Sequence, residues 1–187
     1  MLMLYLSMIE TEAQRALFTD LYEKYRFGLF RQADKYLHDA YDAEDAVHDV
    51  FCVVADEYIS VFENKSEEYC RRFLFVAVKN RAINIGRKKA RVVSLDALRE
   101  NGDDLTDAPK EDPIGKMLSE KDLLEKAKEE IKKLEPRYGD VLWMQLTGCP
   151  VKTIARFFGE RPVTITKRLY RAKLMLRQAV CGEGGAA

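Results

Sequence analysis

The stretch FFGERPVTITKRLYRAK, residues 157–173, decides how the carboxy-terminal part of this chain folds. Gly159 and Pro162 separate two apolar runs, and a segment rich in lysine and arginine follows. Glycine readily takes the left-handed conformation that ends a helix, and proline fits the first position of a helix because no N–H is needed there. Pro150 fits that position in the same way for the preceding run. The stretch therefore predicts two short helices joined by a tight turn, the helix-turn-helix pattern.

The second helix of this pair is expected to have two chemically different faces. Its apolar residues recur at the spacing of a buried helical stripe: Ile165, Leu169, Ala172, Leu176 and Ala179. The opposite face and its beginning carry hydroxyl and basic side chains that are candidates for DNA contact: Arg161, Thr164, Lys167, Arg168 and Arg171. Glu160 is the only acid between Lys152 and Arg177. Solvated faces usually mix both signs of charge, so DNA binding is favoured over a merely solvated helical hairpin.

Composition excludes several classes of protein. The chain has 187 residues, with 31 basic and 31 acidic side chains and a pI near 6.8, so the basic segment is a local feature. Four widely spaced cysteines and no CxxC pair indicate reduced thiols in a cytoplasmic protein. The apolar opening, residues 1–9, is too short to span a bilayer and lacks a basic leader, so we expect a first helical turn packed on the body and no membrane insertion.

Helical periodicity dominates the first half of the chain. Apolar residues recur at helical spacing over 12–37, and a second helix is predicted to begin with Asp42 as its N-cap. Its expected buried stripe consists of Val47, Val50, Phe51, Val54 and Tyr58. A third helix is predicted after an N-cap at Ser66, and it ends in the basic run RKKAR, residues 87–91.

The region after this third helix has the composition of a linker. RENGDDLTDAPKEDPIG, residues 99–115, contains glycine, proline and mostly acidic charge. Helical periodicity then resumes and is expected to stop at Pro136. No internal repeat and no strand-like alternation is present. We therefore predict an all-α chain of two small helical domains, 1–94 and 117–187, joined by a flexible acidic linker, 95–116, with the helix-turn-helix in the second domain.

Three ordered motifs and this carboxy-terminal region resemble one known family. LEPRYGDVLWMQLTGCPVKTIARFFGERPVTITKRLYRAK resembles the promoter-binding domain of bacterial RNA polymerase sigma factors of the extracytoplasmic-function type. FTDLYEKYRFGLFRQA, DAEDAVHDVF and RRFLFVAVKNRAINIGRKKAR resemble the amino-terminal domain of the same group, in the same order, and together the resemblance covers Phe18 to Val180. It implies a subunit without enzymatic activity or cofactor that binds core RNA polymerase and directs promoter-specific transcription initiation.

The resemblance implies a polymerase-binding role for the DAEDAVHDVF helix. Its exposed face would dock on the clamp of the largest polymerase subunit through Asp45, His48, Asp49, Cys52 and Asp56. Acidic charges at the rim of an interface steer docking more than they add affinity. Without the resemblance, the motif is a capped helix with an acidic first turn. No metal site is expected, because no further ligand pair accompanies His48 and Cys52.

The resemblance also implies capture of promoter DNA by the amino-terminal domain, in both melted and duplex form. Unstacked bases of the minus-ten element would be held by the loop before the third helix and by the start of that helix: Asn64, Lys65, Ser66, Arg72, Phe75, Lys79 and Asn80. The basic end of the helix, including Arg87 and Lys88, would grip the duplex backbone upstream. The plainer alternative is core packing with a basic helix terminus that suits the helix dipole.

The carboxy-terminal domain would bind the minus-thirty-five element through its recognition helix. The acidic linker would thread the nucleic-acid channel of polymerase, with Glu100, Asp103, Asp104, Asp107, Glu111 and Asp112 as the charges involved. An anti-sigma protein is left open as a further partner. Departures from the family pattern include Phe73 in place of tryptophan and Asn84 in place of aspartate. The alternative function is a helix-turn-helix regulator that binds duplex DNA without core polymerase; enzyme chemistry is disfavoured, since no nucleophile–base pair stands out.

Overall fold

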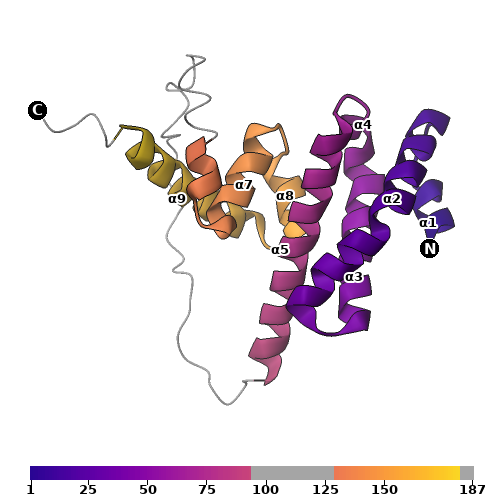
Figure 1. Ribbon diagram of the computed structural model, residues 1–187, viewed down its shortest axis with the longest axis horizontal. Helices are drawn as coiled ribbons and strands as arrows, with labels where there is room; N and C mark the ends of the chain where they lie inside the picture. Colours follow the sequence, from indigo (N-terminus) through magenta and orange to yellow (C-terminus); the bar gives the residue numbers. More distant parts are fainter. Residues whose placement is uncertain (94–128, 182–187) are drawn as a thin grey trace, which may run out of the picture. The chain divides into compact units, whose positions relative to one another are not determined.

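The computed structural model describes residues 1–93 and 129–181, and every regular element within these ranges is a helix (Figure 1). The prediction of an all-α chain is therefore confirmed for this part of the molecule. The predicted linker, 95–116, and the helical run that begins at 117 lie outside the described residues, apart from residues 129–133. The chain divides into two compact units: unit 1 comprises Met1–Arg99 with Arg156–Glu160, and unit 2 comprises Glu100–Ala155 with Arg161–Ala187.

Unit 1 is built on three helices that pack against one another, α2 (Glu12–Leu37), α3 (Ala40–Val53) and α5 (Glu67–Val93). Two short helices accompany them, α1 (Leu2–Ser7) before α2 and α4 (Ile59–Phe62) before α5. Tyr5 of α1 is only 2% exposed, which confirms that the apolar opening of the chain packs on the body.

Side-chain caps determine where these helices begin. Thr11 Oγ1 accepts a hydrogen bond from the Gln14 amide at 3.2 Å, and Ser66 Oγ accepts one from the Tyr69 amide at 3.2 Å, as predicted for Ser66. The prediction that Asp42 caps α3 is wrong. Asp39 is the cap, because its extended backbone lets its carboxylate accept from the Asp42 amide at 3.1 Å. Asp42 instead lies in the first turn, where the helix dipole favours an acid.

A short π-helix, η1 (Val54–Tyr58), follows α3 directly and was not predicted. A wider turn of this kind changes the angular position of every later side chain, and π-helical turns are frequent at functional sites. Here the turn exposes Asp56 and Glu57 while it keeps Val54 and Tyr58 buried. The predicted apolar stripe of this segment is buried throughout, from Val47 to Tyr58.

The core of unit 1 is rich in aromatic rings. Tyr58 stacks on Phe73 of α5 with ring centroids 4.7 Å apart, and Phe62 meets the Phe73 ring edge-on at 5.4 Å. Phe157 lies 4.9 Å from Phe73, which places it in the same cluster of unit 1. Phe18 and Phe51 join α2 to α3 at 5.6 Å. These contacts fix the rotation of α3 and α5, and therefore determine which of their side chains face outward.

Unit 2 contains α7 (Pro136–Leu146) and α9 (Pro162–Cys181), which pack together, and the beginning of α8 (Val151–Phe158). Ile165, Leu169, Ala172 and Leu176 of α9 are buried as predicted, whereas Ala179 is half-buried. Gly159 has the predicted left-handed backbone, with φ of 64°. Pro162 begins α9 as predicted, but Pro150 precedes α8 because its carbonyl accepts the first bond of that helix, from the Ile154 amide at 2.9 Å.

No helix in the described ranges is both long and apolar enough to cross a membrane. Cys52, Cys70 and Cys149 do not form disulfide bonds.

Loss of the Ser66 cap should destabilise the start of α5. In Ser66→Ala the amide of Tyr69 loses its acceptor, so we expect the free energy of unfolding to fall by about 1 kcal/mol in urea titrations followed by circular dichroism. Ser66→Asp is the matched control, since it restores an acceptor and places an acid at the helix N-terminus. Equal stability of Ser66→Ala and Ser66→Asp would contradict the role assigned to this cap.

Candidate nucleic-acid and partner-protein interfaces

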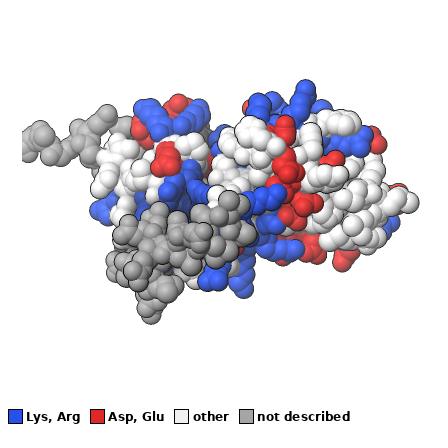
Figure 2. All heavy atoms as spheres, turned by 90° about the horizontal axis from the view of Figure 1, so that it is seen from below, with Lys and Arg blue, Asp and Glu red and all other residues white. Residues whose placement is uncertain are grey.

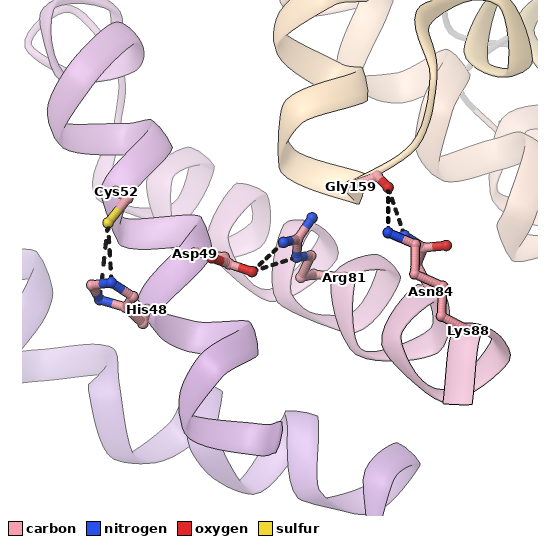
Figure 3. A network of polar contacts seen from close by, with 7 residues as sticks. All are labelled: His48, Asp49, Cys52, Arg81, Asn84, Lys88 and Gly159. Atoms are coloured by element: carbon pink, nitrogen blue, oxygen red, sulfur yellow. Dashed lines mark hydrogen bonds and ion pairs between the residues drawn. The ribbon is translucent and has the colours of Figure 1, made fainter. Parts of the chain in front are cut away.

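The acidic face of unit 1 lies along α3 and η1. Asp45 and Asp56 are exposed, and Asp49 keeps 40% of its side chain exposed while it pairs with Arg81 of α5 (Figure 3). Arg81 Nε donates to Asp49 Oδ2 at 2.8 Å. Three of the five residues expected to bind polymerase, Asp45, Asp49 and Asp56, are therefore exposed. Asp49 is held in place by Arg81, a residue that the sequence analysis did not single out.

The other two residues, His48 and Cys52, are half-buried rather than exposed. The Tyr5 hydroxyl lies 2.7 Å from His48 Nδ1. Figure 3 shows the contact on the other side of the ring, where Cys52 Sγ lies 3.5 Å from His48 Nε2. Burial raises the pKa of the Cys52 thiol and that of the Tyr5 hydroxyl. The expectation that both side chains lie on the exposed face is thus only partly met. Tyr5 of α1 packs against the His48 ring, with ring centres 5.5 Å apart. No group of three metal-ligating side chains occurs in the described part of the chain.

Asp56 and Glu57 both form ion pairs with Arg156, the first residue of the second segment of unit 1. The Arg156 Nη1–Asp56 Oδ2 distance is 2.8 Å, and this hydrogen bond raises the pKa of the guanidinium above its usual value. All three side chains keep between 37% and 45% of their surface exposed. The charge of this end of the acidic face is therefore partly neutralised inside unit 1.

The same segment of unit 1 brings the Gly159 carbonyl to α5. Asn84 Nδ2 donates to this oxygen at 2.7 Å, and Lys88 Nζ approaches it at 3.4 Å (Figure 3). A side chain at Gly159 would collide with the Arg81 guanidinium, in addition to the strain of its positive φ. Asn84 thus has a defined hydrogen-bonding partner.

The loop expected to hold single-stranded DNA is solvent-exposed. Asn64, Lys65 and Ser66 are exposed, as is Arg72 one turn into α5. The Lys65 ammonium lies 5.2 Å from the centre of the Tyr69 ring, so a positively charged group and an aromatic ring lie next to each other here. Proteins that hold single strands combine these two kinds of group.

Three candidates further along α5 are less open than predicted. Asn80 is 8% exposed, and its Nδ2 donates to the Val76 carbonyl at 2.9 Å, so its amide faces the helix and not the solvent. Asn80 is therefore less accessible than a DNA-contacting residue should be, and its contact with DNA stays a prediction. Phe75 and Lys79 are half-buried. The Phe75 ring packs against Gly28, where an added Cβ would come within 3.2 Å of it.

The basic end of α5 is exposed from Arg87 to Arg91. Lys89 pairs with Asp42, and that hydrogen bond raises the pKa of the ammonium. Arg87 and Lys88 are exposed at the surface. On the face drawn in Figure 2, acidic side chains gather in a band beside basic clusters instead of being evenly mixed.

Glu67 positions the start of α5, although no local pattern in the sequence marks it. Tyr25 of α2 donates its hydroxyl to Glu67 Oε1 at 2.6 Å, and Lys24 forms an ion pair with the same oxygen. These two bonds hold the pKa of the Glu67 carboxyl below its usual range. Burial and the bond to Glu67 raise the pKa of Tyr25 to about 12. The exposed loop 64–66 therefore leads directly into a residue, Glu67, that is tied to α2.

In unit 2, the predicted DNA-contacting residues of α9 divide into two groups. Arg161 and Arg171 are exposed, and Thr164 and Lys167 are half-buried. Arg168 is 8% exposed, which corrects the prediction that it lies on the open face. Position 168 directly precedes the buried Leu169 and follows Ile165 by three residues, so it lies at the edge of the apolar stripe. A long side chain at such an edge packs its methylene stem along apolar neighbours.

Comparisons with known proteins identify no relative of this chain. A scan against protein-family models, a search of curated proteins and a search of solved structures each found no significant match.

The Glu67 contacts should make stability depend on pH in the acid range. Because the pKa of this carboxyl is lower in the folded chain, its contribution is complete above the pKa of about 4.3 in the unfolded chain and is lost as the pH falls through the folded value. We expect the difference in unfolding free energy between wild type and Glu67→Gln to be largest near pH 7 and to shrink towards pH 3. A difference that stays constant across this range would contradict the assignment.

Proposed function

We propose that this protein is a specificity subunit of bacterial RNA polymerase, a sigma factor of the extracytoplasmic-function type. The observation that carries the proposal is the division of exposed charge between separate elements. Unit 1 presents an acidic face along α3 and η1, with Asp45, Asp49 and Asp56 open to solvent, and unit 2 presents Arg161 just before α9 and Arg171 on α9. A protein that binds both another protein and DNA needs two such surfaces of different chemistry.

The acidic face is the proposed docking site for core polymerase. Its carboxylates would meet basic side chains of the clamp and set the orientation of docking. Arg81 would support this contact by holding Asp49 in one position, which reduces the entropy that docking costs.

Promoter DNA is the second proposed partner. The exposed loop Asn64–Ser66 and Arg72 would hold bases that leave the duplex, while Arg87 and Lys88 would contact the phosphates of the adjoining duplex. Each base that stacks on an aromatic side chain contributes about 1–3 kcal/mol, which is comparable to the cost of unstacking it. In unit 2, Arg161, Thr164, Lys167 and Arg171 would contact the upstream promoter element through the groove and the backbone. Arg168 would instead stabilise α9.

The α8–turn–α9 segment also suits the alternative function, a regulator that binds duplex DNA by itself. The observation that favours it is local: Gly159 and Pro162 end α8 and begin α9 within a few residues, as in a helix-turn-helix. The two functions differ in whether polymerase is required.

A band-shift experiment with promoter DNA selected by the polymerase-bound protein distinguishes these functions. We expect a shifted band with wild-type protein and core polymerase together, and no site-specific band with the protein alone. Tight site-specific binding by the free protein would favour the regulator. Absence of binding to core polymerase would contradict the sigma-factor proposal.

Arg171→Ala should weaken binding to the upstream element when core polymerase is present. If Arg171 contacts a phosphate, the slope of log affinity against log salt should become shallower by about one. Arg177→Ala is the matched control, because Arg177 is an exposed arginine later on the same helix and outside the proposed contact set. Equal effects of the two substitutions on affinity and slope would contradict a specific role for Arg171.

Asp45→Arg should slow association with core polymerase, because a rim charge acts mainly on the rate of encounter. Stopped-flow measurements at low and high salt should show a lower association rate and a weaker salt dependence than wild type. Glu23→Arg provides the same charge change at an exposed position of α2 and should leave the rate close to that of wild type. A similar loss of rate in both variants would indicate only a net-charge effect.

A further inference from the structure

The exposed face of α9 is centred on a residue that the sequence analysis did not select. Ile165, Leu169 and Ala172 are at most 3% exposed and define the buried side of the helix. Each residue turns an α-helix by about 100°, so a position two residues before Ile165 lies about 200° around the helix from it. That position is Val163, which is 57% exposed. Val163 therefore lies on the side of α9 opposite the core.

Two cationic side chains lie on the same side of α9 as Val163. Lys167 and Arg171 follow it by four and eight residues, a spacing that places all three in one row along the helix. Arg171 is exposed and Lys167 is half-buried, whereas Arg168 is only 8% exposed. At 1.5 Å per residue the row extends over about 12 Å, which is close to the width of the major groove of DNA. The row thus combines one apolar and two cationic groups over a length that fits the groove.

The start of α9 holds Val163 in a fixed orientation. The Arg161 carbonyl accepts hydrogen bonds from the amides of Thr164 at 3.0 Å and Ile165 at 3.3 Å. Pro162 is the first residue of the helix, and its ring fixes the backbone just before Val163. Valine is branched at Cβ, so one rotamer predominates in a helix. Its methyl groups therefore form a preorganised apolar surface, and a contact with them costs little conformational entropy.

The location of Val163 indicates which chemical group it contacts. A single exposed valine is common on protein surfaces and does not by itself mark a site. The first residues of a recognition helix, however, are those that contact base edges in the major groove. The groups that the bases present there are hydrogen-bond donors and acceptors, apart from the 5-methyl group of thymine. An apolar side chain at this place therefore fits thymine better than the other bases.

We propose that Val163 is a specificity-determining residue, which contacts the 5-methyl group of a thymine in the upstream promoter element while Lys167 and Arg171 contact the polar groups and phosphates beside it. The inference rests on the proposed function and deepens it, because it assigns a base preference to one side chain. A phosphate contact by Arg171 positions the helix but carries no sequence information, whereas a contact of Val163 with a base edge does.

The test replaces each thymine of the upstream element in turn by deoxyuridine, which lacks only the 5-methyl group and keeps the pairing groups of thymine. The affinity of the full-length chain with core polymerase is measured on each duplex. We expect deoxyuridine at one position to weaken wild-type binding by about fourfold, the effect of one buried methyl group. Val163→Ala should weaken binding to the unmodified duplex by a similar factor. Deoxyuridine at the sensitive position should then cause no further loss, because the contact is already absent.

Met175→Ala is the matched control, since Met175 is an apolar residue of α9 that is 37% exposed and lies about three turns beyond Val163. It should bind as the wild type does and keep the sensitivity to deoxyuridine. Val163→Ala should leave the salt dependence of affinity unchanged because it removes no charge, in contrast to Arg171→Ala. Both substituted side chains are exposed, so thermal melts should show that the two variants fold.

The outcomes separate this inference from the proposed function. If the wild type binds with core polymerase but no deoxyuridine changes its affinity, or the selected element contains no thymine, the inference fails and the proposed function stands. If deoxyuridine at the sensitive position weakens Val163→Ala as much as the wild type, another residue contacts the methyl group and the inference fails. If the wild-type protein with core polymerase does not bind the unmodified duplex, the proposed function fails and the inference fails with it.

Discussion

Burial of the aromatic cluster around Phe73 is the constraint on which the rest of unit 1 depends. Tyr58, Phe62, Phe73 and Phe157 are each at most 1% exposed, and their rings pack in stacked and edge-on pairs. Full burial of one such side chain contributes roughly 1.5–3 kcal/mol, and favourable ring geometry adds about 0.5–1.5 kcal/mol. Once the apolar side chains of η1, α4 and α5 are committed to this cluster, the remaining positions of these helices must face outward. Asp56 of η1 and the basic end of α5 are exposed as a result.

The π-helical turn η1 shows how the core and the candidate interface are coupled. Asp56 and Glu57 of η1 both reach solvent, while Val54 and Tyr58 of the same turn enter the core. The same five-residue segment therefore contributes to both the acidic face and the core. A substitution within η1 that restored α-helical geometry would move acidic side chains as well as apolar ones.

Much of the fold could be predicted from local sequence, because its causes are local. The α2 limits, the Ser66 cap, the buried stripe from Val47 to Tyr58 and the left-handed Gly159 each follow from spacing or from the properties of one residue type. The start of α3 was missed because Asp39 and Asp42 are both good caps, and the choice between them depends on the path of the preceding turn. Periodicity could not show that α3 would become π-helical, since a single wider turn leaves the apolar pattern nearly unchanged.

The candidate site was less predictable, because its decisive contacts join residues far apart in the chain. Asp49 and Arg81 are separated by 32 positions, and Tyr25 and Glu67 by 42. The sequence indicated which candidate residues lie on α3 and α9 but could not indicate which long side chains turn inward. Arginine and asparagine are residue types that often contact DNA. Arg168, however, lies at the edge of an apolar stripe, and Asn80 donates a hydrogen bond to its own helix. A helical face assigned from spacing alone is uncertain at its edges, where one rotamer decides between solvent and core.

The acidic face forms ion pairs with arginine side chains of its own unit, and these ion pairs do not prevent it from binding a partner. The Asp56–Arg156 pair is formed at the surface, with both side chains 45% exposed. Ion pairs in such positions contribute about 0.2–1 kcal/mol, because water solvates the separated charges nearly as well. A partner's lysine or arginine can therefore replace Arg156 at small cost. The Asp49–Arg81 pair is different, since only 20% of the Arg81 side chain is exposed. If Asp49 turned to another partner, the Arg81 guanidinium would be left as a poorly solvated charge. The acidic face thus combines one pair that a partner can exchange, Asp56–Arg156, with one pair that is held fixed, Asp49–Arg81. The first leaves a carboxylate open to a partner, and the second keeps the geometry of the face when a partner binds.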